Sequence, residues 1–549
     1  MTSAIPPASP AAALKVEGLA FHAQDAEPRT DFQHLYHHLN TVCRSWAPSR
    51  LKELFRYMGR EGMLSLAGGL PHPELFPFQK LDVLVYDYNT RLAAGNTSIG
   101  TVDLSVPKTK SASHATDLST ALQYGDAVGL PALQAIIGRF VKRIYSPAYD
   151  EYQVVLSHGS TDGWHKVVSM FLEYGDTILV EAQTYPASQA LWIPMGCTTA
   201  PVTLDGDGMV PEALDKMLDN WHRDHAGRKK PRLMYCIPVG QNPTGSTLTA
   251  QRKRKIYDIC VRHDIIICED DPYYFLQFPT YDSQADHEVP ATVPTLDVPK
   301  FIDSLEPSFL KYDYDGRVIR LDTFSKTIAP GLRLGWMIAN PLFAERLLRA
   351  SELFTQTPAG WSQAIVTELL TTWGDDGYLT WVNNLRETYI ARRNWMCSFI
   401  DKHFDVDWAS MSADGAPVYF KSSTGRHQGP VAFKFVPPKA GMFVWLTIEL
   451  GQNPHYQRLK SAAPARDDAP SAEEQWMTEV WEQLAEARVL LVPGSYYASW
   501  HWQGHPTAGE AISSDLAFFR LSFSMMKRDG MDEAIRRMEQ VFKADWYGA

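Results

Sequence analysis

Between residues 122 and 372 the chain alternates short apolar runs with amphipathic segments. The apolar runs are rich in β-branched residues and predict strands at Gln153–Ser157, Thr177–Glu181, Arg232–Ile237, Ile265–Glu269, Val318–Asp322 and Leu334–Ala339. The segments between them have helical periodicity and predict helices such as Thr161–Glu173 and Thr249–His263. Alternating strands and helices indicate βαβ units, so we expect an α/β fold with a mostly parallel sheet and helices on both faces.

The pattern changes after a long predicted helix, Gly377–His403. Glycine, proline and polar runs separate further predicted strands at Gly441–Ile448, Val489–Val492 and Ala517–Ser524, which favours a smaller α+β domain. We therefore predict a disordered, Ala- and Pro-rich tail (1–30), a segment that joins the small domain and an interface (31–78), a large domain (79–375) and a small domain (376–549).

Three stretches interrupt this pattern, namely 96–120, 278–315 and 411–437, and we interpret them as surface insertions without assigned chemistry. A helical segment near the start places His34, His37 and His38 on one face. Three histidines on one face can bind a metal ion, or they can simply belong to a surface or interface helix. Because no carboxylate or cysteine accompanies them in the sequence, we predict no metal site.

Composition narrows the class of protein. A chain of 549 residues predicts two or three domains, and the net charge of -11 argues against a nucleic-acid partner. The sequence has no apolar run of about 18 residues, so we expect no membrane segment. Six cysteines without CxxC spacing predict reduced thiols and a cytoplasmic protein.

The strongest chemical signal is the segment Thr323–Gly335. It sets Lys326 beside the hydroxyls of Thr323 and Ser325, and Arg333 follows seven residues later. A lysine can form an imine with an aldehyde, and hydroxyls with an arginine suit a phosphate. The combination indicates pyridoxal phosphate, although a solvated surface turn also accounts for the segment.

Three further elements follow predicted strands, at the edge where open α/β sheets bind ligands. The segment Gly159–Asp162 begins a predicted helix, whose free backbone N–H groups could bind a phosphate. Alternatively, its Ser, Thr and Asp residues form an ordinary helix N-cap. Tyr185 can stack on a flat ring or pack in the core. Asn242 can donate to a ring oxygen or a carboxylate, or its loop is a plain turn.

Two charged elements complete the pattern. Glu269, Asp270 and Asp271 follow an apolar strand, where carboxylates need a cationic partner. A carboxylate that faces a pyridine nitrogen would keep the ring protonated, and a Mg²⁺ site is the alternative. Arg520 lies in an apolar strand and suits either a substrate carboxylate or a structural ion pair.

Taken in order, these elements resemble the fold-type-I pyridoxal-phosphate aminotransferases. Within them the chain is most similar to fungal aromatic amino acid aminotransferases and to the kynurenine/α-aminoadipate aminotransferases. The resemblance runs from about residue 65 to residue 524. The matching stretches are Ser65–Pro77, Ala121–Gly125, Glu269–Phe278, Thr323–Gly335, Ala440–Trp445 and Phe519–Ser524.

The resemblance implies a role for each site residue. Lys326 is the Schiff-base lysine and proton carrier, and Asp271 faces the pyridinium nitrogen. Tyr274 and Asn242 hold the ring hydroxyl, and Tyr185 stacks on the ring. The phosphate is held by Ser160, Thr161, Thr323, Ser325, Arg333 and Tyr124 of the partner subunit. The substrate carboxylate is bound by Arg520, Asn242 and the backbone near Gly68 and Gly69.

Two positions depart from the family pattern. Thr161 stands where relatives often have glutamine, and Thr323 where they often have serine. Both positions keep a hydroxyl or a backbone donor, so we still expect a phosphate site.

The expected activity is a ping-pong transfer of the amino group from an aromatic L-amino acid, of the tyrosine, phenylalanine, tryptophan or kynurenine class, to a 2-oxo acid. The resemblance implies 2-oxoglutarate as the acceptor and a homodimer with shared sites. A 2-aminoadipate aminotransferase and another pyridoxal-phosphate enzyme, such as a lyase, are the alternatives. A non-catalytic regulator would carry a basic DNA-binding module, and the Ala- and Pro-rich start offers none.

Overall fold

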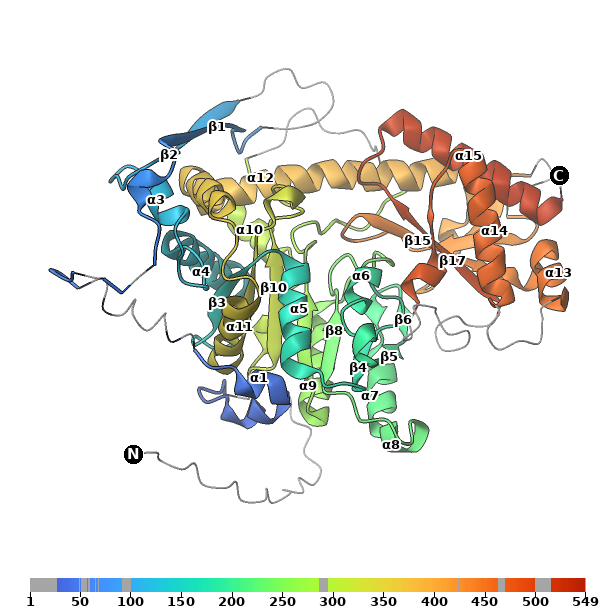
Figure 1. Cartoon of the computed structure of the whole chain (residues 1–549). Coiled ribbons are helices and arrows are strands. Elements are labelled where there is room, and N and C mark those ends of the chain that lie inside the picture. Colours follow the sequence, from blue (N-terminus) through green and yellow to red (C-terminus); the bar gives the residue numbers. More distant parts are fainter. Residues whose placement is uncertain are drawn as a thin grey trace.

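The computed structural model describes residues 27–48, 50, 57, 60–64, 66, 67, 69–90, 100–285, 295–422, 425, 427–462, 470–498 and 515–548. These residues form two large sheets and two small two-stranded ones, and helices pack around the large sheets (Figure 1). Most of the predicted tail, and Gly68, lie outside the described residues.

A seven-stranded sheet forms the centre of the large domain. Its strand order is β3-β11-β10-β9-β8-β4-β5, and β11 is the one strand antiparallel to its neighbours. The bounds are β3 Gln153–Ser157, β4 Thr177–Glu181, β5 Thr198–Val202, β8 Leu233–Cys236, β9 Ile266–Asp270, β10 Val318–Thr323 and β11 Gly335–Ala339. The predicted α/β fold with a mostly parallel sheet is therefore confirmed.

Helices cover both faces of this sheet because its strands are apolar on both sides. Side chains that alternate along β10 enter two different cores: Ile319 and Leu321 join one, and Val318 joins the other. The first core includes α1 Thr41–Ser45, α5 Ser160–Phe171 and α11 Pro341–Phe354. The second includes α4 Pro131–Tyr145, α7 Pro211–Asp219, α9 Ala250–His263 and α10 Val298–Asp303. Short helices complete the domain: α3 Leu118–Ala121, α6 Pro186–Gln189 and α8 Trp221–Asp224.

One long helix, α12 Gly360–His403, connects the large domain to the small one and crosses the top of the molecule in Figure 1. It begins earlier than predicted, and Gly374 interrupts its helical geometry with a positive φ of 67°. Its first half packs on the large-domain core and its second half on the core that extends into the small domain. The predicted domain limit at 375 stays a prediction, and this interruption lies beside it.

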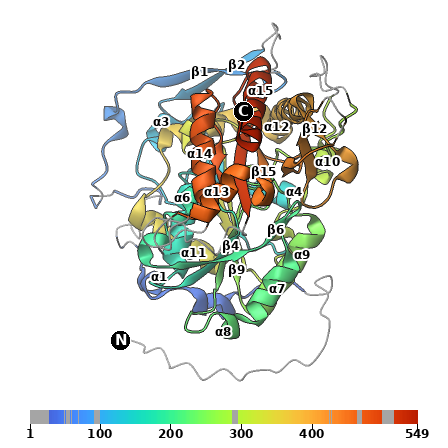
Figure 2. The same cartoon turned by 90° about the vertical axis from the view of Figure 1, so that its right-hand side faces the viewer.

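The small domain contains a six-stranded antiparallel sheet in the order β12-β13-β14-β15-β17-β16. The strands are β12 Phe404–Val406, β13 Ala416–Phe420, β14 Val431–Phe435, β15 Phe443–Glu449, β16 Val492–Pro493 and β17 Leu516–Ser522. Helices α13 Pro454–Ala462, α14 Ala472–Glu486 and α15 Arg528–Tyr547 lie beside it (Figure 2). Phe519 packs against Trp476 of α14 and Phe542 of α15, so the neighbouring Phe518 and Arg520 face the other way, toward the large domain.

The three predicted surface insertions need correction. Residues 101–107 of the first form strand β2 Thr101–Pro107, which pairs with β1 Lys80–Tyr86. The third contains β13 and β14 of the small-domain sheet. In the second, Ser308, Phe309 and Leu310 are fully buried. A small hairpin, β6 Leu204–Asp205 with β7 Gly208–Met209, follows β5.

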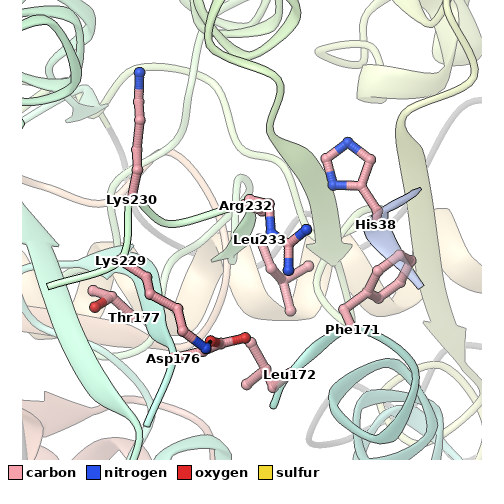
Figure 3. Close-up of a pocket in the computed structure, with 9 residues that line it drawn as sticks. All are labelled: His38, Phe171, Leu172, Asp176, Thr177, Lys229, Lys230, Arg232 and Leu233. Carbon is pink, nitrogen blue, oxygen red and sulfur yellow. Dashed lines mark hydrogen bonds and ion pairs between the residues drawn. The ribbon is translucent and has the colours of Figure 1, made fainter. Parts of the chain in front are cut away.

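The predicted histidine helix is the 3₁₀ helix Gln33–His38. The Nε2 atoms of His37 and His38 lie 2.7 and 2.9 Å from the two carboxylate oxygens of Asp264. Beside His38 is a small pocket at the amino ends of β4 and β8, with Lys229, Lys230 and Arg232 around it (Figure 3). Its volume of about 20 Å³ holds about one water molecule, so it is too small for a cofactor. Within the described part of the chain, every helix is too short or too polar to cross a bilayer.

Candidate active site

Several of the predicted site residues lie at the carboxyl ends of the parallel strands. Strands β9 and β10 are neighbours, and they end at Asp270 and Thr323. Lys326 lies in the turn that follows β10, and Asn242 lies in the loop that follows β8. The site is therefore at the edge where open α/β sheets bind ligands.

A cradle for a phosphate forms where β10, β11 and the start of α5 meet. The hydroxyls of Thr323 and Ser325 are 2.7 Å apart, and the Ser325 N–H donates to the Thr323 hydroxyl at 3.1 Å. Gly159 precedes α5 with a φ of 95°. A Cβ atom there would lie 3.3 Å from Nη2 of Arg333 and 3.6 Å from Oγ1 of Thr323, so the backbone, the hydroxyls and the guanidinium converge.

The first turn of α5 faces this cradle with donors that the helix itself cannot satisfy. Ser160 and Thr161 are its first two residues, where backbone N–H groups have no intrahelical acceptor. The Ser160 hydroxyl is buried and has no hydrogen-bond partner among the described residues. Together with Arg333 these groups suit a dianionic phosphate.

Lys326 is half-buried, and its Nζ atom lies 6.0 Å from the centre of the Tyr273 ring. Burial lowers the pKa of the Lys326 amine below its ordinary value. A larger neutral fraction of an amine favours attack on an aldehyde and acceptance of a proton.

The end of β9 corrects the prediction for Asp271 and Tyr274. Because side chains alternate along a strand, Asp270 and Asp271 point to opposite faces. Asp271 contacts Nη1 of Arg320 at 3.0 Å, and Tyr274 packs edge-on against Tyr145, in the core on the far face. The structure does not bring these two residues to Lys326.

Asp270 and Tyr273 lie on the opposite face from Asp271 and Tyr274, the face that carries Lys326. Oδ2 of Asp270 accepts a hydrogen bond from the Tyr235 hydroxyl at 2.8 Å, and Oδ1 has no partner among the described residues. Burial raises the pKa of the Asp270 carboxyl to about 6, against the opposing effect of the Tyr235 hydrogen bond. Tyr273 lies beside Lys326. Burial and the charge of Asp270 raise the pKa of the Tyr273 hydroxyl, and the charge of Arg520 lowers it.

Arg320 explains why Asp271 is turned away. Its guanidinium is fully buried beneath the site and contacts three carboxylates, those of Glu269 at 3.2 Å, Asp271 at 3.0 Å and Asp322 at 2.9 Å. It also lies over the rings of Tyr145 and Tyr274, at 4.0 and 4.7 Å from their centres. The sequence reasoning missed Arg320, although an arginine inside the apolar run Val318–Leu321 was a readable signal.

The substrate side of the site is built by Arg520 of β17. Nη1 of Arg520 donates to Oδ1 of Asn242 at 2.7 Å, which joins the two domains. The guanidinium lies 4.3 Å from the centre of the Phe443 ring and 5.2 Å from that of Tyr497. The charged neighbours that act on Arg520 are tyrosine hydroxyls, and its Nε atom has no partner among the described residues, so they supply no carboxylate for a structural ion pair.

The remaining predicted residues are placed as follows. Tyr185 is 37% exposed and directly precedes α6. Burial raises the pKa of the Tyr273 and Tyr497 hydroxyls, and Tyr185 lies close enough to raise it further. Gly69 is exposed with open space around its Cα atom, and Tyr124 is 66% exposed in the single chain. Gly68, also predicted to bind the substrate, lies outside the described residues.

These residues fit pyridoxal phosphate. The cradle at Gly159 would be filled by a Cβ atom, and Ser160, Asp270 and Arg520 each keep a buried polar atom without a partner in the described structure. An anion fits the cradle, a protonated ring nitrogen fits Oδ1 of Asp270, and a carboxylate fits Arg520.

Residues 89–538 match the family described as aminotransferase class I and II. The chain belongs to this family. The aminotransferase is 33% identical over 511 residues to an aromatic amino acid aminotransferase of Schizosaccharomyces pombe, with 93% of this chain and 98% of that protein covered. It is 34% identical over 470 residues to an L-tyrosine:2-oxoglutarate aminotransferase of Serpula lacrymans, with 84% of each covered.

A solved structure agrees with these relatives. The aminotransferase Aro8 from Candida albicans matches with a TM-score of 0.80 and 30% identity, over 95% of this chain and all of that one. The predicted membership of the pyridoxal-phosphate aminotransferases is thus confirmed, with the cofactor that the family uses.

Proposed function

We propose that this aminotransferase moves the amino group of an aromatic L-amino acid to 2-oxoglutarate. The observation that carries the proposal is Arg520, a partly buried guanidinium whose hydrogen-bond partner is an amide and not a carboxylate. A substrate α-carboxylate would supply the missing anion. The names of the S. pombe and Serpula relatives support the aromatic donor and the acceptor.

The residues divide the work between binding and proton transfer. The Lys326 amine would hold the cofactor covalently, and the cofactor would supply an electron sink. Once the amino group of the substrate displaces it, the Lys326 amine would move a proton from the substrate Cα. Asp270 would keep the ring nitrogen protonated, and Tyr273 and Asn242 would bind the ring hydroxyl. The face of Tyr185 would cover the ring.

The phosphate and the substrate take the remaining groups. Ser160, Thr161, Thr323, Ser325 and Arg333 bind the phosphate. Arg520 orients the α-carboxylate, with Asn242 and the backbone near Gly69 beside it.

The activity is tested by incubating the enzyme with tyrosine and 2-oxoglutarate. The proposal expects glutamate and the matching aromatic 2-oxo acid in equal amounts, and no pyruvate or ammonia. Release of ammonia would instead support a lyase, and turnover of 2-aminoadipate in preference to tyrosine would support the other alternative. A panel of amino donors against 2-oxoglutarate ranks the substrates.

We also propose a homodimer in which Tyr124 of the partner subunit completes the phosphate site, since this ring is 66% exposed in one chain. Mixing inactive K326A and Y124A subunits tests it. A mixed dimer would have one site with both defects and one intact site, so activity should return on mixing. No recovery in a mixture proven to exchange subunits would contradict the shared site.

For the location, we propose the cytoplasm. All six cysteines are buried and free, as expected for a reducing compartment. Fluorescence of the tagged protein in cells tests this, and a mitochondrial signal would contradict it.

A further inference from the structure

The two carboxylate oxygens of Asp270 have different surroundings. Oδ2 accepts a hydrogen bond of 2.8 Å from the Tyr235 hydroxyl, whereas Oδ1 has no partner among the described residues. The side chain is 7% exposed, so little water can compensate. The hydrogen bond therefore fixes which oxygen stays available at the site.

Tyr235 is rigidly held. It lies on β8, next to β9, where it pairs in register with Cys268. Its ring packs against Trp164 at 4.5 Å and Trp192 at 6.4 Å between centres, and it is fully buried. Burial and the charge of Asp270 raise the pKa of the Tyr235 hydroxyl well above its ordinary value, so this hydroxyl stays a donor.

We propose that Tyr235 is a positioning residue that keeps the Asp270 carboxylate ionised and aims its free oxygen at the ring nitrogen of the cofactor. A hydrogen bond to the charged form of an acid stabilises that form. The ionised carboxylate in turn favours a protonated ring. This inference rests on the proposed function, in which Asp270 and not Asp271 faces the ring.

Other charged groups also face Asp270, and the two of opposite charge act in opposite directions. From β10, Arg320 and Asp322 act on it with opposite signs, and Arg320 is itself paired with Asp271 and Asp322. Cys268 of β9 and Tyr273 of the next turn lie near it as neutral groups with raised pKa values. Against the effect of burial, the nearby Ser160 hydroxyl also lowers the pKa of Asp270, but less than Tyr235 does. Tyr235 is thus the group whose removal changes the carboxylate most directly.

The chain offers a matched control. The hydroxyl of Tyr257, on α9, donates to Oδ1 of Asp313 at the same distance, 2.8 Å, and both residues are fully buried. Burial raises the pKa of Asp313 to about 7, and the Tyr257 hydrogen bond opposes this, as Tyr235 does for Asp270. Tyr257→Phe therefore makes the same chemical change away from the site.

The test compares two cofactors. Apo forms of the wild type, Y235F, Y257F and D270N are titrated from pH 6 to pH 9 with pyridoxal phosphate and with its 1-deaza analogue, in which C–H replaces the ring nitrogen. The ratio of the two dissociation constants reports the nitrogen alone, because phosphate and aldehyde are common to both. Unchanged affinity for the analogue also shows that a variant is folded.

We expect the wild type to prefer pyridoxal phosphate by roughly tenfold to a hundredfold at pH 7, the size of one charged hydrogen bond. D270N should abolish the preference at every pH. Y235F should lose it near pH 6 to 7 and regain it as the pH rises, with a midpoint about one pH unit above that of the wild type. Y257F should follow the wild type.

A Y235F profile that coincides with those of the wild type and Y257F would overturn the role of Tyr235. A wild type without any preference would instead overturn the placement of Asp270 in the proposed function. Should Y235F bind neither cofactor, Tyr235→Met gives the same comparison, and a wild-type midpoint in that variant contradicts the inference.

Discussion

Two adjacent aspartates at the end of β9 have opposite duties. Asp270 has an oxygen without a partner among the described residues and lies near Tyr273, whereas Asp271 is paired with Arg320 on the far face. In the proposed function, the carboxylate at position 270 contributes to the reaction, whereas the one at position 271 contributes to the stability of the core. Substitution by asparagine separates the two duties because it removes charge with little change in volume.

We predict that D270N lowers kcat/KM by about a hundredfold to a thousandfold, the usual cost of losing one preorganised electrostatic partner. It should leave thermal unfolding of the apo protein close to that of the wild type. D271N should show the reverse pattern, with a lower unfolding temperature and a smaller loss of kcat/KM. Steady-state kinetics and calorimetry measure both, and equal kinetic losses would contradict the assignment.

A second residue-scale prediction concerns the amine of Lys326. Burial lowers its pKa below the ordinary lysine value of 10.5, so at a given pH a larger fraction is neutral and nucleophilic. In the apo protein, acylation of Lys326 should therefore reach half its maximal rate below pH 10.5. Mass spectrometry of peptides labelled across a pH series gives this midpoint. A midpoint at or above 10.5 would refute the claim.

At the scale of elements, β9 and β10 are joined by one buried cation. Arg320 pairs in register with Glu269, and it also contacts Asp271, just past the end of β9, and Asp322, two residues further along β10. It also lies between two tyrosine rings. Because both strands lead directly into the site, this cluster sets the geometry of the turns that carry Asp270 and Lys326.

We expect R320M to destabilise the protein by about 3–5 kcal/mol, since it leaves buried carboxylates without their cation. Urea unfolding of the apo protein measures the change. The control is R143M, which removes an exposed arginine from its pair with Asp376 at 2.6 Å and should cost less than about 1 kcal/mol. Similar losses in the two variants would contradict a special role for the buried cluster.

Sequence periodicity was sufficient to find most strands of the large domain, because each is a short apolar run between turn residues. It did not resolve the end of β9, where three consecutive acids give no sign of which one faces the site. Tertiary contact with Arg320 decides that orientation. Strand β2 was missed because its Ser and Thr residues made the segment look like a polar loop. Its apolar residues nevertheless alternate, as in a strand, at Val102, Leu104 and Val106, and the last two of these are buried.

At the scale of the whole molecule, two glycines from the large and the small domain meet next to the loop that carries Asn242. Gly240 follows β8, and Gly441 precedes β15. A Cβ atom on Gly441 would lie 2.8 Å from the carbonyl oxygen of Gly240, and one on Gly240 would lie 2.6 Å from Cα of Gly441. The two backbones touch directly, and both glycines have positive φ, 58° and 79°.

We predict that G441A moves the domains apart and raises KM for the amino acid about tenfold or more, because Asn242 and Arg520 lie on opposite sides of this contact. Affinity for pyridoxal phosphate should change little, since the phosphate cradle belongs to the large domain. The control is G451A, which has open space around it. A normal KM in G441A, with wild-type unfolding, would argue against the contact as a determinant of domain spacing.

The alternation along β9 also bears on how such chains diverge. If one residue between Ile265 and Glu269 were deleted, the three consecutive acids that follow would still align with those of related sequences. In the folded protein, however, the acid that faces the Arg320 guanidinium and the acid proposed to face the cofactor ring would exchange faces. Insertions or deletions in β9 should therefore be far rarer among related chains than amino-acid replacements there. Where one occurs, we expect a matching insertion or deletion in β10.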